Sequence, residues 1–82
     1  MRSASVERLR VVGVKQVTRA LRAGKLRRVY LASDAAQRLT KALESEAAAL
    51  HVSVEWVPTM GELARRFHVD VPSAAAGEYG NE

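Results

Sequence analysis

The spacing of apolar residues in the first third of the chain predicts two helices and two strands. A short helix is expected over residues 3–10, followed by a brief β segment over 11–13. A second helix is expected over 14–23, and Gly24 directly follows it, as a glycine that ends a helix should. Residues 26–32 are a strand candidate that runs into Ser33 and Asp34. The apolar side of the 14–23 helix consists of positions i, i+3 and i+7, which are Val14, Val17 and Leu21.

The middle of the chain predicts a long helix and a strand. Asp34, with Gln37 three residues later, resembles a capping box that would begin a helix over residues 35–50. Residues 52–57 alternate between apolar and polar side chains, which indicates a strand. The expected buried stripe of the long helix consists of Ala36, Leu39, Leu43, Ala47 and Leu50.

The last third of the chain predicts one more helix and gives only a weak pattern for the C-terminal end. Thr59 and Glu62 form a second capping box, which predicts a helix over residues 60–67. Residues 69–78 are a weaker candidate for a last strand, because this segment is rich in alanine and contains proline and glycine. Residues 77–82 are expected to be a frayed tail.

Helices that alternate with strands predict an α/β protein. Such an order covers both faces of a sheet, so we expect a three-layer α/β/α sandwich with a mixed sheet of about four strands. The chain has 82 residues, which is the size of one domain, and we therefore expect a single domain over 1–82.

Composition excludes several classes of protein. The chain has no cysteine, and no apolar run approaches the roughly 18 residues that a membrane span needs, so we expect a cytoplasmic domain without a membrane partner. His51 and His68 lie in different predicted elements, at the expected ends of helices. The sequence has no nucleophile elbow, phosphate-binding glycine loop or acidic cluster. We therefore expect no enzymatic activity, metal, cofactor or small-molecule substrate.

Positive charge is concentrated at the start of the chain. The first 30 residues hold nine Lys and Arg residues and one acid, Glu7, for a net charge of +8. The remaining residues hold four basic and eight acidic side chains, for a net charge of −4. Self-repulsion on this scale opposes folding unless an anion is bound. Ten of the 13 basic residues are arginine, whose planar group suits phosphates and guanine edges, so nucleic acid is the first partner to consider.

The predicted helix over 14–23 carries a stripe of basic residues. Lys15, Arg19 and Arg22 lie at positions i, i+4 and i+7, and Gly13 precedes the helix. A glycine there permits a close backbone approach, and a helix amino end offers free N–H groups to an anion. A lysine in the first turn opposes the helix dipole unless an anion is present. A solvated basic face is the alternative explanation of this charge pattern.

The same residues resemble a known family. The segment 13–19, with sequence GVKQVTR, resembles the Gly-x-Asn-Glu-x-x-Lys signature of the L-seven-Ae family of kink-turn RNA-binding ribosomal proteins, and especially its bacterial YbxF/YlxQ-like branch. Residues 26–34 resemble the family's strand that ends in an Ala-x-Asp turn, and 57–60 resemble its second RNA-contacting loop. The chain departs from the family pattern at Ala64 and His68, where glycine is usual.

The resemblance implies a sandwich fold and binding to a kink-turn, a sharply bent RNA with tandem sheared G·A pairs. It implies a ribosome-associated protein, or one that stabilises RNA folding, as part of a ribonucleoprotein. Lys15 and Gln16 would reach guanine edges beside Gly13 and Val14. The implied phosphate contacts are Arg19, Arg22, Lys25 and Arg28, and the implied contacts to an extruded nucleotide are Val57, Pro58, Thr59 and Met60.

A second function remains open from the sequence. The basic surface could bind an acidic protein partner as an interaction or assembly module, a reading that the departures at Ala64 and His68 allow. In either case we expect a monomer.

Overall fold

The computed structural model describes residues 10–80, and these residues form four strands and three helices. The predicted helix over 3–10 lies outside the described residues except for Arg10, which begins the first strand. The elements in chain order are β1 (Arg10–Val12), α2 (Val14–Arg22), β2 (Leu26–Ala32), α3 (Gln37–Ala49), β3 (Ser53–Val57), α4 (Met60–Arg66) and β4 (Ala75–Tyr79).

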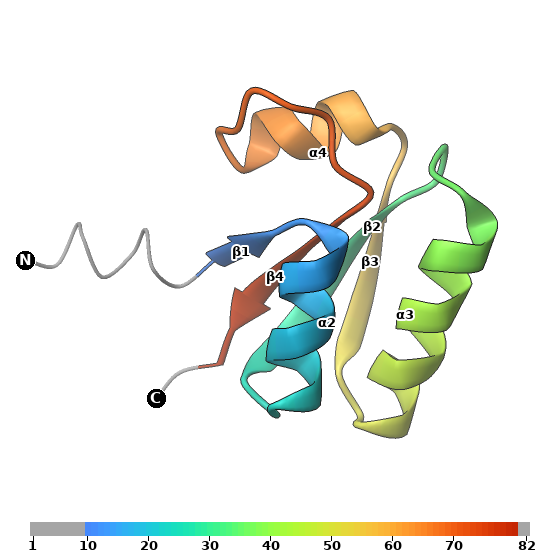
Figure 1. The fold of residues 1–82 in the computed structure, drawn as a ribbon, viewed down its shortest axis with the longest axis vertical. Helices are drawn as coiled ribbons and strands as arrows, with labels where there is room; N and C mark the ends of the chain where they lie inside the picture. Colours follow the sequence, from blue (N-terminus) through green and yellow to red (C-terminus); the bar gives the residue numbers. More distant parts are fainter. Residues whose placement is uncertain (1–9, 81–82) are drawn as a thin grey trace, which may run out of the picture.

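The four strands form one mixed sheet in the order β1-β4-β2-β3 (Figure 1). β2 and β3 are parallel, and α3 makes the crossover between them. β4 lies between β1 and β2 and is antiparallel to both. The last strand of the chain is therefore at the centre of the sheet, where it joins the first strand to the other two.

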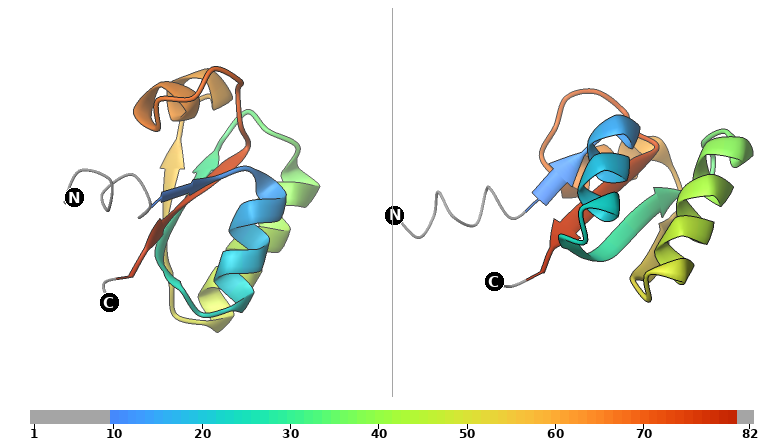
Figure 2. Two further views of the ribbon diagram at one scale, coloured as in Figure 1. Left: turned by 60° about the vertical axis from the view of Figure 1, so that its left-hand side comes forward. Right: turned by 60° about the horizontal axis from the view of Figure 1, so that its bottom comes forward.

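Helices cover both faces of the sheet, which confirms the predicted three-layer α/β/α sandwich (Figure 2). α2 and α3 lie side by side on one face, over a core that includes Val17, Leu21 and Leu43. α4 lies on the other face, where Leu63 packs against Val57. Within residues 10–80, no helix is both long enough and apolar enough to cross a membrane.

The prediction of a frayed tail over 77–82 is wrong for residues 77–79. They belong to β4, and Ala75, Ala76 and Gly77 are all buried. Small residues are needed in this strand because side chains of the neighbouring strands pack closely against it. A Cβ atom at Gly77 would lie 2.7 Å from Leu26 Cδ1 and 3.2 Å from Val11 Cγ1. The alanine and glycine content that weakened the strand prediction is what lets β4 occupy the centre of the sheet.

All three helices end in the same way. The residue after each C-cap has a left-handed backbone, with φ of 73° at Gly24, 59° at His51 and 57° at His68. At Gly24, the N–H donates to Leu21 O and the next N–H donates to Ala20 O, which is the hydrogen-bond pattern of a Schellman motif. The same pattern occurs at the two histidines. The prediction that both histidines lie at helix ends is confirmed.

The start and the buried stripe of α3 differ from the prediction. The helix begins at Gln37, and its N-cap Ala36 has no side-chain capping bond within the described part of the chain. The predicted capping box at Asp34 is therefore wrong. The buried residues of α3 are Thr40, Leu43 and Ala47, whereas Leu39 and Leu50 are 36% and 48% exposed. Leu39 and Leu50 share a flank with Glu46, which contacts α2, so they border the junction between the two helices instead of the sheet.

The packing around Gly77 predicts opposite effects for the same substitution at two glycines. Gly77→Ala should lower the free energy of unfolding by about 1–3 kcal/mol, because the new methyl group overpacks the contact with Leu26. Gly61→Ala should raise it by about 0.5–1 kcal/mol, because nothing lies closer than 3.9 Å to its Cβ position and alanine favours a helix. Urea unfolding of both variants checks this, and equal effects at the two sites would contradict it.

The left-handed backbone conformation of His51 and His68 predicts a second effect on stability. His51→Gly and His68→Gly should each raise the free energy of unfolding by about 0.5–1 kcal/mol, because glycine adopts this backbone without strain. Thermal unfolding measures the gain. The matched controls are His51→Ala and His68→Ala, which keep the strained backbone and should give no gain.

Candidate functional site

One edge of the sheet gathers the starts of all three helices. The register pairs Val12 with Ala76, Leu31 with Ala75, and Ala32 with Val57. The carboxyl ends of β1, β2 and β3 therefore lie at the edge where β4 begins. Because α2, α3 and α4 each follow one of these strands, their amino ends all lie at this edge. Helix amino ends carry partial positive charge, so this edge favours anions.

Gly13 fixes the position of the amino end of α2. Its N–H donates to Ala75 O at 2.9 Å, and its carbonyl oxygen accepts from Val17 N at 2.8 Å, so this residue joins the sheet to the first turn. Its φ of 112° is in the region that favours glycine. A Cβ atom here would also collide with the Gln16 carboxamide oxygen. The backbone conformation therefore favours glycine here, while the exposed Gln16 side chain could move to make room for a Cβ atom.

The first turn of α2 presents free hydrogen-bond donors. The first N–H groups of any helix have no acceptor within that helix. Within residues 10–80, no side chain caps α2, and its first turn contains no acidic residue. Lys15 and Gln16 are exposed in this turn. An anion bound here would receive backbone hydrogen bonds together with the charge of Lys15.

A groove of about 350 Å³ lies beside this helix end. Gly13 and Gln16 form one wall, and the loop of residues 69–73 forms the other. Val71 in this loop is 70% exposed, although it is apolar. None of the residues predicted from the sequence to bind RNA lies in this loop. The sequence marks this loop only by Pro72 and by the lack of a clear helical or strand pattern around it.

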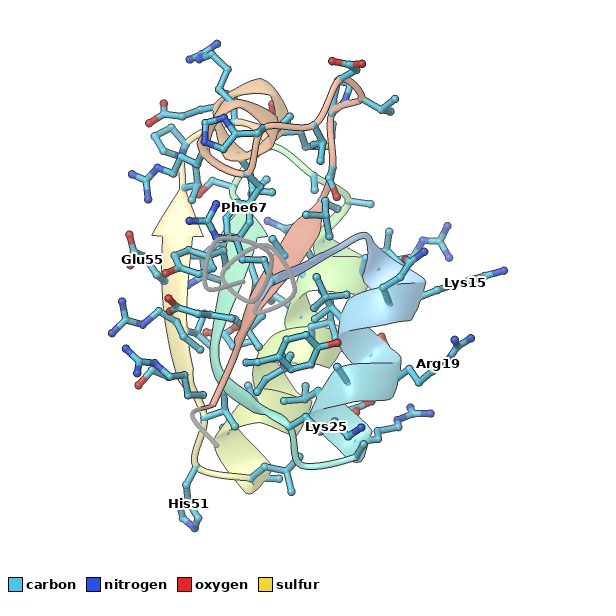
Figure 3. All side chains as sticks on the ribbon, turned by 90° about the vertical axis from the view of Figure 1, so that its left-hand side faces the viewer. Lys15, Arg19, Lys25, His51, Glu55 and Phe67 are labelled. Atoms are coloured by element: carbon cyan, nitrogen blue, oxygen red, sulfur yellow. The ribbon has the colours of Figure 1, made fainter. Side chains whose placement is uncertain are left out.

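The structure divides the predicted basic residues into two groups. Lys15, Arg19 and Lys25 lie along α2 and the turn after it (Figure 3), and among the described residues they have no acidic partner within 4.0 Å. Arg22 and Arg28 form salt bridges. Arg28 pairs with Glu55 at 3.7 Å on the opposite face of the sheet, so it is not brought together with Lys15.

Arg22 is held by α3. Its Nε donates to Glu46 Oε1 at 3.1 Å, and its Nη2 donates to Glu46 Oε2 at 2.8 Å. These hydrogen bonds lower the pKa of the Glu46 carboxyl from its usual value and raise the pKa of Arg22. The pair therefore stays ionised at neutral pH, and two of the guanidinium donors are occupied by a carboxylate.

The predicted nucleotide-contacting segment over 57–60 has mainly structural roles. Val57 is fully buried in the core beneath α4, so its side chain does not reach the surface. Thr59 caps α4 by accepting from Glu62 N at 3.0 Å, which confirms the predicted cap. Met60 is half-buried against the same core, and its N–H donates to Asp34 Oδ1 at 2.9 Å. Pro58 is exposed.

Asp34 therefore caps a different helix from the one predicted. It comes from the loop after β2 and binds the first residue of α4 across the sheet edge. Ser33 N in the same loop donates to Val57 O at 2.8 Å. These two bonds fix the loop after β2 against the end of β3 and the start of α4.

The fold and this edge define a small α/β protein whose α2 begins without a side-chain cap within the described residues, and known proteins share this fold. RNA-binding protein TTE2299 of Caldanaerobacter subterraneus subsp. tengcongensis is 33% identical over 69 residues, which cover 84% of each chain. The chain belongs to the family of this protein. No protein-family model matches the sequence.

Solved structures share the fold. A protein of unknown function from Bacillus halodurans C superimposes with a TM-score of 0.80 at 25% identity, covering 89% of this chain and 73% of the other. The Giardia lamblia 15.5kD RNA binding protein superimposes with a TM-score of 0.76 at 19% identity, covering 92% of this chain and 63% of the other. The latter likeness concerns the fold alone.

The capping role of Asp34 predicts how substitutions at this residue change the free energy of unfolding. Asp34→Ala should lower the free energy of unfolding by about 1 kcal/mol, because the Met60 N–H loses its acceptor. Asp34→Asn keeps an acceptor oxygen and should stay within a few tenths of a kcal/mol of the native chain. Chemical unfolding distinguishes the two variants, and equal losses would mean that charge rather than the cap is responsible.

Proposed function

We propose that this protein binds structured RNA at the amino end of α2, and that its target is a kink-turn with tandem sheared G·A pairs. The observation that carries the proposal is the start of α2 behind Gly13, which has no side-chain cap within residues 10–80 and lies beside basic side chains that have no acidic partner in that part of the chain. The relative that shares 84% of its length with this chain is named an RNA-binding protein, which supports RNA as the ligand class. The protein would act by binding, as a ribosome-associated protein or one that stabilises folded RNA.

The shape of RNA explains why a helix end is suited to a bent target. The major groove of a regular A-form helix is too deep and narrow for side chains to read. A sharp bend opens this groove, and the tapered start of α2 can then approach the bases. Gly13 keeps that start free of a side chain, so the backbone donors can come close to the RNA.

The exposed side chains of the first turns have separate roles in this proposal. Lys15 and Gln16 face solvent at the helix end and reach guanine edges of the G·A pairs. Arg19, one turn further along, contacts a phosphate. The groove between Gln16 and residues 69–73 has apolar walls near Val71 and receives an unstacked base. Base contacts would set the choice of RNA, and phosphate contacts would add affinity for any RNA.

These roles predict different losses for variants on one helix. Lys15→Ala and Gln16→Ala should each reduce the preference for a kink-turn over a G·A-disrupted duplex by about five- to a hundred-fold, the size of one specific base contact. Arg19→Ala should weaken both RNAs about equally and reduce the slope of log K against log salt by about 0.7–0.9. Mobility shift at several salt concentrations measures both quantities.

Exposed residues of the same types on α3 provide the controls. Lys41→Ala and Gln37→Ala remove an exposed lysine and an exposed glutamine that line none of the three grooves described beside α2, and they should leave the preference unchanged. If Lys15→Ala keeps the full preference, the proposed base contact is wrong. If the native chain binds the kink-turn and the disrupted duplex equally, kink-turn recognition itself is wrong.

A further inference from the structure

α2 has a shallow groove along each of its two flanks. The first groove, of about 420 Å³, begins at Lys15 and follows Val14, Thr18 and Arg22. The last three residues are spaced at i, i+4 and i+8, and Arg22 reaches Glu46 on α3, so this flank faces α3. The second groove, of about 200 Å³, is bordered by Gln16, Lys25 and Tyr79, on the flank that faces β1 and β4. Arg19 lies between the two and lines both.

A carboxylate disfavours a polyanion at the end of the first groove that Arg22 lines. Glu46 lies at its far end, bound to Arg22 by two hydrogen bonds. A phosphate that approached Arg22 would have to displace this carboxylate or lie beside it. Either arrangement is unfavourable, because like charges repel and the broken bonds must be replaced.

The second groove offers basic side chains without such competition. Arg19 and Lys25 line it, and no acidic residue of the described chain does. The backbone of Lys25 is fixed on both sides, because its N–H donates to Ala20 O at 3.1 Å and its carbonyl accepts from Gly80 N at 2.8 Å. The Lys25 side chain therefore starts from a rigid position beside the end of β4.

The second groove also continues from the proposed RNA site. Gln16 lines both this groove and the one formed with residues 69–73. A single surface thus runs from the amino end of α2, past Arg19, to Lys25 and Tyr79. The nine residues of α2 extend about 13 Å at a helical rise of about 1.5 Å per residue, which corresponds to about four nucleotide steps of about 3.4 Å.

We infer that an RNA strand leaving the α2 amino end follows the β1 side of this helix. Arg19 and Lys25 neutralise successive stretches of its phosphate backbone, and a nucleotide at the far end lies against the Tyr79 ring. The Arg22–Glu46 pair forms the border of the RNA-binding surface and makes no contact with the strand. This inference rests on the proposed function and assigns the path of the same ligand.

The test compares two variants that alter opposite flanks of α2. Lys25→Gln removes the positive charge on the β1 side. The double variant Arg22→Gln with Glu46→Gln removes the ion pair on the α3 side and leaves the net charge unchanged. The probe is a kink-turn RNA with a flanking stem, titrated over a range of salt concentrations, and a straight duplex is the reference.

The expected result is a loss for one variant only. Lys25→Gln should weaken binding of the kink-turn RNA and reduce the salt slope by about 0.7–0.9, the value for one phosphate contact. The double variant should bind within twofold of the native chain with the same slope. A reduced slope for the double variant, with no change for Lys25→Gln, would place the strand on the α3 side and overturn the inference.

A second variant keeps the inference testable through a different group. Tyr79→Leu retains an apolar side chain against the core and removes the ring, so it should weaken binding without a change in salt slope. Unchanged binding by both Tyr79→Leu and Lys25→Gln would also overturn the inference. A failure of the proposed function is distinguishable, because the native chain itself would then bind the kink-turn no better than the straight duplex.

Discussion

The hydrogen bond from the Gly13 N–H to the Ala75 carbonyl ties the start of α2 to the central strand. It extends the ladder between β1 and β4 by one residue, beyond the Val12–Ala76 pair. On the other side, Ala32 N donates to Ala74 O, so the beginning of β4 is held from both neighbouring strands. This arrangement brings residues 69–73 against the amino end of α2. The geometry of the candidate site therefore depends on the last strand of the chain, more than 60 residues from Gly13.

The ion pairs explain how a strongly basic segment is tolerated in a small domain. Acidic groups from α3, β3 and β4 neutralise Arg22, Arg28 and Arg27, respectively. The basic residues that keep no such partner in the described chain include Lys15, Arg19 and Lys25, which share the outer side of α2 and its turn. These three cations lie together on one surface, and their combined positive charge favours an anionic ligand there.

Local patterns predicted most of this fold. β2 has the predicted bounds, α2 begins at the predicted residue, and Thr59 caps α4 as its spacing to Glu62 indicates. These features depend on residues within one or two turns of each other. The paired state of Arg22 was not predictable, because its partner lies 24 positions away and only the packing of α2 against α3 brings them together. The prediction for Asp34 was wrong for the same reason. Its carboxylate oxygen accepts a hydrogen bond from the first residue of α4 instead of capping α3, the helix that follows it in sequence.

The starts of α4 and α2 differ in their capping, whereas α3, like α2, begins without a side-chain cap and carries a cation, Arg38, in its first turn within the described chain. α4 receives two side-chain acceptors, from Thr59 and Asp34, and carries Glu62 in its first turn. α2 is longer and more central to the core, yet within residues 10–80 it receives none and carries Lys15 where the helix dipole disfavours a cation. The chain thus contains the means to cap a helix and does not use them at α2. Sites where local rules of stability are broken are commonly those where a ligand completes the structure. An RNA phosphate at the start of α2 would supply the missing acceptor and reverse the unfavourable position of Lys15 in one step.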